Sequence, residues 1–394
     1  MGKISVLMLG TSGYALGYLQ ELLHEERGKR FELIGAVDPY AQNGKMYGDL
    51  VERGIPIYDT VEEFYAEHTA DVAFIVTPIY LHAYQAIYCM EHGSDVLCEK
   101  PICATLADAR AMMEARDRTG RKLAIGFQWS FAEGILSLKQ DILNGVYGKV
   151  KRIRTRIMWP RNLDYYGRGS GWAGKRRLAS GEWVFDSVAA NATAHYLHNM
   201  LFLTGHEIAR SAEVASLTAE VYQVNQIEMF DTCALRLYTK DGVELVFLAT
   251  HASEDVTQPD FVLEGEKGTV TFRQENGEKI LEGQWADGRV ISYLQPDIDP
   301  RRKLYCMADA ITEDKPLSCV AETVLPHLEC INTLAELFPV TPRIPDEFIR
   351  FLEGNRQYVC TGIEEIFEQC YQEGKLPYEI GAAWAQKPKE KIFN

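Results

Sequence analysis

The sequence has few of the features that mark secreted or membrane-spanning proteins. Its 9 cysteines form no CxxC pair, and most stand in apolar runs, as Cys89, Cys98 and Cys233 do. This usage is typical of reduced core thiols in a cytosolic protein. No stretch approaches the roughly 20 apolar residues that a membrane span requires, and the apolar run in MGKISVLMLG is too short for the core of a signal peptide. We therefore expect a cytoplasmic protein with no membrane partner.

Basic residues are fewer than acidic residues. The chain has 41 of them against 56 acidic residues, a net charge of −15. A field of this sign repels nucleic acid and anionic membrane surfaces, so we expect no nucleic-acid partner. The hydrophobic share of 46% and the charged share of 25% are those of an ordinary globular protein. A length of 394 residues favours two domains over one.

Apolar strands alternate with helical patterns over the first third of the chain. Strands are expected at 4–9, 31–37, 72–76, 95–98 and 122–127, and helices at 13–25, 80–92 and 105–119. Continuous apolar strands separated by helices are typical of a parallel sheet covered on both faces. The first third is therefore predicted to be a βαβ domain.

After about residue 127 the pattern changes. A helix at 133–145, an alternating strand KVKRIRTRIMW and a helical stretch at 187–204 are followed by strand-like runs at 214–224, 232–239, 243–250, 261–265 and 268–272. Neighbouring strands joined by turns such as KDG and EKG predict a mainly antiparallel sheet. The fold class is therefore α/β, with two different sheets.

The turn after the first strand, LGTSGYALG, carries a partial dinucleotide-binding pattern. Gly10, Ser12 and Ala15 occupy the three places of G-x-G-x-x-G, although two of the glycines are missing. A structural strand-turn-helix is the alternative. Asp38 ends the next strand, where a carboxylate can bind a ribose diol and repel a 2′-phosphate; before Pro39 it would also fit a plain turn. Together these features favour NAD.

Two further motifs follow. VTPIYLHAYQA contains Thr77, Pro78 and His82, and VLCEKPI contains Glu99, Lys100 and Pro101. With the Gly10 turn before them, their order resembles the Gfo/Idh/MocA family of nicotinamide-dependent sugar and polyol oxidoreductases, and EGEKGTVTF at 264–272 resembles that family's second domain. The resemblance implies an N-terminal Rossmann NAD-binding domain at 1–126. It also implies a C-terminal α/β domain at 127–394 that binds substrate, with a large open sheet that mediates homo-oligomerisation as a dimer or tetramer.

The resemblance places Lys100 beside the nicotinamide and the substrate hydroxyl. A solvated lysine after a strand is the ordinary alternative, and His82 could simply cap the helix that it begins. The other expected cofactor contacts are Gly10, Thr11, Ser12, Gly13, Tyr14, Ala15, Asp38, Thr77, Pro78, His82 and Glu99.

The stretch NATAHYLHNMLFLTG carries the family's substrate motif in altered form. Counting back from Gly205, the resemblance places His195 at the catalytic histidine, while Asn191 and His198 replace aspartates. Residues at −4, 0 and +3 share one face of a helix, so these three side chains are expected to converge. Asp186, five residues upstream of Asn191, is a candidate for the missing carboxylate. Core histidines are an alternative, and no metal is expected because no spacing supplies further ligands.

The loop WPRNLDYYGRGSGWAGKRRLASGEW combines aromatic and basic residues. Flat rings suit the apolar face of a sugar, and Arg or Lys would contact hydroxyls or a carboxylate. A subunit contact has a similar composition. The expected substrate contacts are Trp159, Arg161, Tyr166, Arg168, Trp172, Asn191, His195 and His198.

Together these features predict an NAD(H)-dependent oxidoreductase of carbohydrate metabolism. It would act on a secondary hydroxyl of a sugar, glycoside or cyclitol, or on the corresponding ketone, with Lys100, His195 and Asn191 as the catalytic residues. Two alternatives stay open. One is redox-neutral glycoside cleavage through a transient keto sugar, in which NAD is recycled. The other is a non-catalytic NAD-binding sensor.

Overall fold

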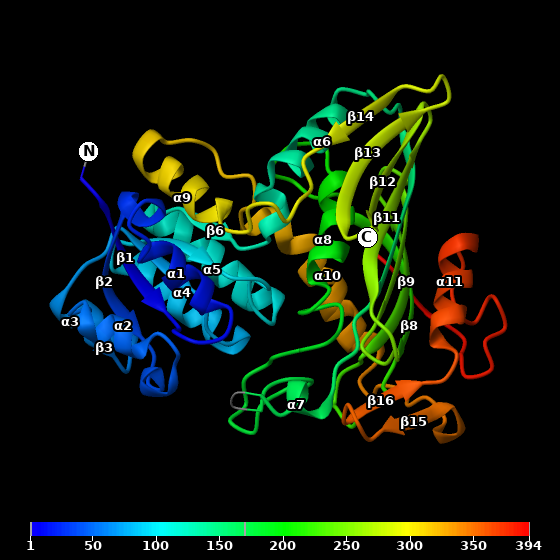
Figure 1. Ribbon diagram of the computed structural model, residues 1–394, viewed down its shortest axis with the longest axis horizontal. Coiled ribbons are helices and arrows are strands. Elements are labelled where there is room, and N and C mark those ends of the chain that lie inside the picture. The colour runs from blue at the N-terminus through cyan, green and yellow to red at the C-terminus, as the bar shows by residue number, and fades with distance from the viewer. Residues whose placement is uncertain (1, 169–170, 394) are drawn as a thin grey trace. The chain divides into compact units, whose positions relative to one another are not determined.

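The computed structural model describes residues 2–168 and 171–393, and the chain divides into two compact units (Figure 1). Unit 1 comprises Met1–Phe131 and Asp299–Leu325, and unit 2 comprises Ala132–Ile298 and Pro326–Asn394. The expected division into 1–126 and 127–394 assigns Asp299–Leu325 to the second domain, whereas in the structure this segment belongs to unit 1. The functions assigned to the two parts stay predictions.

Unit 1 contains a six-stranded sheet in the order β3-β2-β1-β4-β5-β6. Every neighbouring pair in this sheet is parallel, which confirms the predicted Rossmann-type sheet. β4 and β5 are buried at every position, because both faces are covered. The strands are β1 (Ile4–Leu9), β2 (Phe31–Val37), β3 (Ile57–Tyr58), β4 (Val72–Ile75), β5 (Asp95–Cys98) and β6 (Leu123–Ile125).

Two helices of unit 1, α3 and α5, have recognisable caps. Thr60 and Glu63 form a reciprocal capping box at the start of α3, and Gly120 ends α5 in the left-handed conformation. Helix α9 comes from the returning segment. The helices are α1 (Ala15–Leu22), α2 (Tyr47–Glu52), α3 (Val61–Glu67), α4 (His82–Glu91), α5 (Leu106–Thr119) and α9 (Arg302–Glu313).

Unit 2 is built on a nine-stranded sheet in the order β14-β13-β12-β11-β7-β10-β9-β8-β17. β7 and β10 are parallel neighbours, and the other pairs are antiparallel, so the predicted mainly antiparallel sheet is confirmed. The strands are β7 (Val150–Met158), β8 (Val214–Tyr222), β9 (Thr232–Thr239), β10 (Glu244–Thr250), β11 (Thr257–Gly265), β12 (Gly268–Glu275), β13 (Glu278–Trp285), β14 (Val290–Tyr293) and β17 (Lys389–Ile392).

Helices lie on both sides of this sheet. Figure 1 shows α6 (Glu133–Leu143) and α8 (Ala194–Leu203) on one side and α11 (Ile363–Glu373) on the other. The short helix α7 (Leu163–Tyr166) and the hairpin of β15 (Ile349–Leu352) and β16 (Gln357–Cys360) complete unit 2, and α10 (Ala321–Leu337) runs from one unit into the other. None of the helices that the structure describes is long and apolar enough to cross a membrane.

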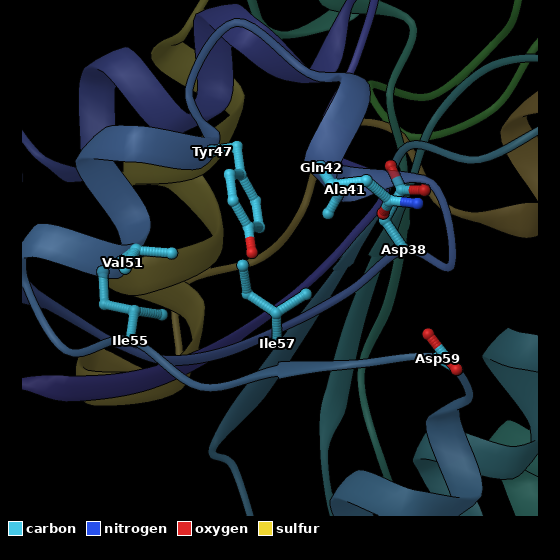
Figure 2. Close-up of a pocket in the computed structure, with 8 residues that line it drawn as sticks. All are labelled: Asp38, Ala41, Gln42, Tyr47, Val51, Ile55, Ile57 and Asp59. Atoms are coloured by element: carbon cyan, nitrogen blue, oxygen red, sulfur yellow. The ribbon is translucent and has the colours of Figure 1, made fainter.

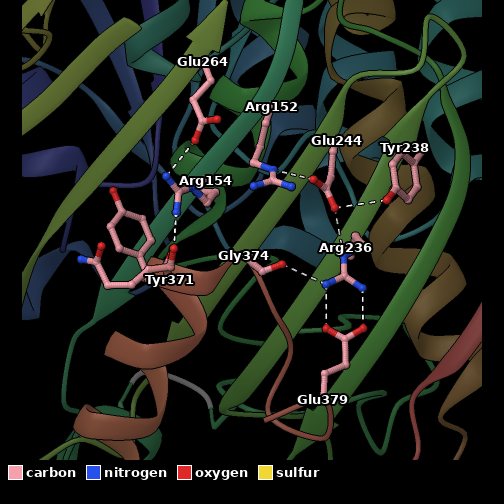
Figure 3. Close-up of polar contacts among 10 residues, drawn as sticks. Arg152, Arg154, Arg236, Tyr238, Glu244, Glu264, Tyr371, Gly374 and Glu379 are labelled. Atoms are coloured by element: carbon pink, nitrogen blue, oxygen red, sulfur yellow. Dashed lines mark hydrogen bonds and ion pairs between the residues drawn. The ribbon is translucent and has the colours of Figure 1, made fainter.

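The alternating strand β7 presents arginines to the α11 side of the sheet. Figure 3 shows Arg154 donating to the carbonyl of Tyr371 at 2.7 Å and to Glu264 at 2.7 Å. Nearby, Arg236 binds both carboxylate oxygens of Glu379, at 2.6 and 2.7 Å. Part of this face is thus covered by the chain's own C-terminal region. The expected homo-oligomer stays a prediction.

Candidate active site

The turn between β1 and α1 is fixed to the end of β2. Gly10 has φ +91°, and a Cβ there would lie 2.6 Å from the carbonyl oxygen of Val76, so this position requires glycine. Thr11 donates to Asp38 from its backbone N at 2.9 Å and from its hydroxyl at 2.7 Å. The other oxygen of Asp38 accepts from the backbone N of Tyr40 at 2.9 Å. Asp38 therefore orders the turn that was predicted to hold a pyrophosphate.

Asp38 also lines a cavity of about 410 Å³ in unit 1. Figure 2 shows Tyr47, Val51, Ile55 and Ile57 gathered on one side of it and Asp38 and Asp59 on the other. An apolar wall beside carboxylates suits an adenosine, with the base on the wall and the ribose diol at Asp38. As the structure describes it, the lining contains no cation for a 2′-phosphate: Asp38, Ala41, Gln42, Tyr47, Val51, Ile55, Ile57 and Asp59.

Glu99, which directly follows β5, is the centre of a buried polar cluster. Its carboxylate accepts hydrogen bonds from the Tyr18 hydroxyl at 2.6 Å, from Lys303 and from the backbone N of Lys100 at 3.1 Å. The Lys303 side chain is 0% exposed and also donates to the carbonyl of Gly126 at 3.2 Å. Burial alone would raise the pKa of Glu99, but the Lys303 ammonium outweighs it and lowers that pKa.

This cluster explains why an apolar strand ends in Glu and Lys. The ionised Glu99 holds the backbone at Lys100, at the carboxyl end of a parallel strand, where ligands bind in open α/β sheets. Lys303, which sequence reasoning missed, lies on α9, 204 residues beyond Glu99. In the sequence Lys303 ends the basic run Arg301-Arg302-Lys303, which gave no signal that its side chain is buried.

The His82 ring contacts both sequence motifs on which the family resemblance rests, the one that contains Thr77 and the one that contains Pro101. Its Nδ1 lies 2.9 Å from the carbonyl oxygen of Pro101 and its Nε2 lies 2.8 Å from that of Thr77. The ring is buried, and burial lowers its pKa. A neutral ring carries hydrogen on one nitrogen, so one of these contacts is a donated bond. His82 thus connects the loops after β4 and β5, and its direct contact with the cofactor stays a prediction.

The expected helix face in unit 2 needs a correction. Regular helix α8 begins at Ala194, so Asn191 lies in the turns before it. There, Thr193 N bonds to the carbonyl of Val188 at 3.1 Å, and Ala194 N bonds to that of Asn191 at 3.4 Å, spacings that depart from a regular α-helix. The prediction of one shared face is therefore wrong for Asn191, and only His195 and His198 stand three residues apart on α8.

Asn191 instead contacts the carboxylate of Asp186. Its amide donates to Asp186 at 2.9 Å, and the backbone N of Gly174 donates to the other oxygen at 2.6 Å. Asp186 is 3% exposed. The structure therefore places a buried carboxylate beside Asn191, the position at which the sequence lacks one.

His198 lies within the apolar packing of unit 2. It is 1% exposed, with its ring 5.9 Å from that of Phe202 and 6.4 Å from that of His327. Burial, His327 and the nearby Lys139 hold the pKa of His198 well below its ordinary value. The described contacts are those of a core histidine, and its contact with substrate stays a prediction.

The loop after β7 forms a cluster of rings and guanidinium groups around Tyr165. Arg168 lies 3.5 Å from the ring centroid of Tyr165 and 5.0 Å from that of Trp172. Arg161 lies 4.9 Å from the centroid of Tyr165 and 5.9 Å from that of Trp159. The predicted aromatic and basic residues therefore do lie together, with Tyr165 as their shared member.

Two neighbours attach this cluster to the rest of unit 2. Trp159 packs edge-to-face on Tyr196 of α8, with centroids 5.6 Å apart, and His251 places Nδ1 2.7 Å from the carbonyl oxygen of Trp159. Burial and the Arg161 charge lower the pKa of His251 to about 3, which makes it neutral at physiological pH. Sequence reasoning missed His251, although it directly follows a buried strand. Burial raises the pKa of Tyr166, the other predicted ring of this loop.

Two family models match the chain. Residues 4–127 match the oxidoreductase family model with an NAD-binding Rossmann fold, and residues 135–271 match the GFO/IDH/MocA C-terminal domain. The first match contains the Gly10 turn, Asp38 and the strand β5 that precedes Glu99. The second match contains α8 and the ring-rich loop after β7. The Rossmann unit is therefore an NAD-binding unit.

Individual proteins share parts of the sequence and the fold. An inositol 2-dehydrogenase of Rubrobacter xylanophilus is 24% identical over 295 residues, 73% of this chain and 76% of that protein. A 2,7-anhydro-N-acetylneuraminate hydratase of Mediterraneibacter gnavus is 29% identical over 150 residues, 38% of each chain. The WlbA dehydrogenase of Bordetella pertussis, solved with NADH and UDP-GlcNAcA, has the same fold at a TM-score of 0.69 and 22% identity, with 85% of this chain and 96% of that one covered.

Proposed function

This chain belongs to the Gfo/Idh/MocA family of oxidoreductases, and on that premise we propose that it is an NAD-dependent dehydrogenase of a sugar, glycoside or cyclitol. It oxidises a secondary hydroxyl or reduces the corresponding ketone. The observation that carries the proposal is the ionised Glu99, which fixes Lys100 at the carboxyl end of β5. A lysine so held supplies a fixed positive charge where a dinucleotide domain binds its ligand.

The roles of the chain's own residues follow from their chemistry. The bound cofactor would supply the acceptor for the hydride of the carbinol carbon. His195 takes the hydroxyl proton, since an ordinary imidazole has a pKa of about 6.5. Lys100 stabilises the alkoxide that forms as the proton leaves. Asn191, held by Asp186, orients the substrate by hydrogen bonding.

The choice of a carbohydrate is supported by the rings around Tyr165. Trp159, Tyr165 and Trp172 offer flat apolar faces, and arginines next to them offer hydrogen-bond donors. The relatives named as an inositol dehydrogenase and an anhydrosugar hydratase act on compounds of this class. We further propose that the enzyme is a cytoplasmic homo-oligomer. It should prefer NAD to NADP, because two carboxylates, Asp38 and Asp59, line the cavity in unit 1.

A second candidate is redox-neutral turnover, in which the transient ketone acidifies a neighbouring C–H. The proton and the oxygen substituent of the next carbon would then leave together as an alcohol or water. Addition of water to the resulting enone, or the reverse of that step, would precede return of the hydride to the ketone. The relative named as a hydratase favours it, because hydration involves no net oxidation. A silent sensor is the weaker alternative, since Lys100 and His195 are both present.

One experiment tests the proposal. The purified protein is incubated with NAD and a panel of free sugars, glycosides and cyclitols, and NADH absorbance is followed together with mass spectrometry of the products. We expect either NADH formation or a cleaved or hydrated product for at least one compound, lost in Lys100→Ala. A panel that gives neither product, although NAD binds, would leave the sensor as the better description.

A further inference from the structure

Two arginines in unit 2 lie against the ring of Tyr165, and within the described chain neither has a carboxylate partner. Arg168 donates to the carbonyl of Tyr165 at 2.7 Å. Arg161 donates to the carbonyl of Pro160 at 3.3 Å, and its Nε is buried with no hydrogen-bond partner. A guanidinium group has five N–H donors, so Arg161 keeps unused donors in a partly desolvated place.

Arg161 lines a cavity of about 600 Å³ between its own loop and the β15–β16 turn. The other cation in the lining, Arg356, is paired with Asp164 at 2.7 Å. The remaining polar lining comes from uncharged amides, Asn162 and Asn355 among them. The lining therefore carries one uncompensated positive charge, in a chain whose net charge is −15.

Backbone hydrogen bonds hold this cavity in shape. Arg161 N bonds to the carbonyl of His251 at 3.0 Å, and Leu163 N bonds to the carbonyl of Arg356 at 3.0 Å. The loop is thus attached both to the end of β10 and to the turn of the hairpin. A cavity fixed at both sides needs little ordering when a ligand binds, which favours affinity.

The nearby ionisable groups leave the arginines free to take an anion. His251 is neutral, because burial and the two arginine charges lower its pKa to about 3. Asp186 acts electrostatically on Tyr165, yet its oxygens accept from Asn191 and Gly174 rather than from either arginine. A ligand carboxylate would supply the missing negative charge.

We propose that this cavity binds the carboxylate of an acidic sugar, with Arg161 donating two parallel hydrogen bonds and Arg168 adding positive charge. The planar guanidinium fork matches the two oxygens of a carboxylate, whereas a phosphate dianion commonly uses more donors than one fork. The cluster continues to α8 through Trp159 and Tyr196, the neighbour of His195. The assignment of this carboxylate to the enzyme's substrate rests on the proposed function.

The test is a calorimetric titration of the full chain, loaded with NAD, with D-glucuronate, D-galacturonate, their methyl glycosides and N-acetylneuraminate. Glucose and glucose 6-phosphate are titrated alongside. We expect at least one sugar acid to bind more tightly than glucose and glucose 6-phosphate. Arg161→Gln should weaken that binding at least tenfold, a larger loss than for glucose, and Arg161→Lys should recover part of it, because the charge returns without the fork.

The matched control is Arg350→Gln. It removes the same charge from an exposed arginine of β15, which pairs with Glu254 and does not line the cavity, so sugar-acid binding should stay at the wild-type value. Equal affinity for acids and glucose, tighter binding of the sugar phosphate, or no effect of Arg161→Gln would each overturn the carboxylate site.

The two proposals fail separately. Arg161-dependent binding of a sugar acid without any NADH or other product would keep the site and reject the dehydrogenase. Turnover of a sugar, together with sugar-acid binding that Arg161→Gln leaves unchanged, would keep the dehydrogenase and reject the site.

Discussion

The side-chain amide of Asn191 donates a 2.9 Å hydrogen bond to the buried carboxylate of Asp186. Asp186 also accepts from Gly174 N at 2.6 Å, so both of its oxygens are occupied. The family resemblance implies an aspartate at position 191, and here the negative charge stands at 186 instead. An aspartate at both positions would place two carboxylates in hydrogen-bond contact in a site with little water.

Asn191→Asp should therefore destabilise the protein. Loss of the donated bond and repulsion from Asp186 should lower the free energy of unfolding by about 1–3 kcal/mol at neutral pH. The exchanged pair, Asp186→Asn with Asn191→Asp, keeps one amide and one carboxylate and should recover most of that loss. Thermal unfolding of Asn191→Asp, Asp186→Asn and the exchanged pair measures this coupling, and an Asn191→Asp protein as stable as the wild type would contradict it.

Lys303→Met should be among the most damaging substitutions in unit 1. It leaves Glu99 buried without its cation, a change that costs about 3–5 kcal/mol. In the wild type, Lys303 lowers the pKa of Glu99. Without Lys303, burial raises that pKa, so Glu99 can become protonated and neutral. The loss of unfolding free energy in the variant should therefore be smaller at pH 5 than at pH 8. Chemical denaturation at both pH values checks the sign. Adding Glu99→Gln to Lys303→Met should restore part of the stability. A stability loss that is the same at both pH values would contradict the pairing of Glu99 with Lys303.

Much of the fold could be predicted because local pattern and burial agree. β4 is a continuous apolar run in the sequence, β5 is apolar after Asp95, and both are buried throughout in the structure. The parallel pairing of β7 with β10 could not be predicted, because strand order depends on contacts between distant segments. The return of α9 to unit 1 is of the same kind, since Lys303 and Glu99 are 204 residues apart.

The candidate site, like the fold, could be predicted from the sequence only in part. Asp38 and the ring-rich loop were predicted because their residue types are unusual where they stand. The wall of the cavity beside Asp38, from Ala41 to Ile57, was not, because its side chains resemble any amphipathic surface. The start of α8 was misplaced since the residues before Ala194 have helical propensity, but the turns around Asn191 follow the bond to Asp186.

Glu220 makes stability depend on pH in the opposite sense to Glu99. Burial raises the pKa of Glu220 to about 7, despite hydrogen bonds from Tyr222 and Tyr378. A carboxyl whose pKa is raised by folding contributes stability below its unfolded pKa of about 4.3, and this is lost as pH rises through 7. Glu220→Gln should thus be more stable than the wild type by roughly 3 kcal/mol at pH 8 and equal to it at pH 4. The exposed Glu32→Gln is the control, and a gain at both pH values would refute the linkage.

Asp38 should set the preference for NAD. Asp38→Ala should raise the Kd for NAD about tenfold, a loss of about 1.4 kcal/mol, and should remove the discrimination against NADP, because no carboxylate then faces the 2′-phosphate. Thr11→Val deletes the 2.7 Å hydroxyl bond to Asp38 and keeps the carboxylate. It should weaken both cofactors equally. Fluorescence titration of the three proteins with NAD and NADP gives six dissociation constants, and tighter binding of NADP than NAD to the wild type would reject the assignment.

Lys100 and His195 should be required for chemistry and dispensable for cofactor binding. Lys100→Ala removes the charge that stabilises the alkoxide, and His195→Ala removes the proton acceptor, so each should lower kcat by a factor on the order of 10² to 10⁴ with the Kd for NAD nearly unchanged. His195→Ala should also flatten the pH dependence of kcat/KM near neutrality, an effect that damage to folding alone would not produce.

The matched control for His195 is His198→Gln, three residues along the same helix. Its ring lies among Phe202 and His327, so the substitution should lower thermal stability more than it lowers kcat, and the pH profile of kcat/KM should keep its shape. If His195→Ala turned over at nearly the wild-type rate while His198→Gln lost both rate and pH dependence, the proton acceptor would be His198, and the buried ring would have to open toward the substrate for catalysis.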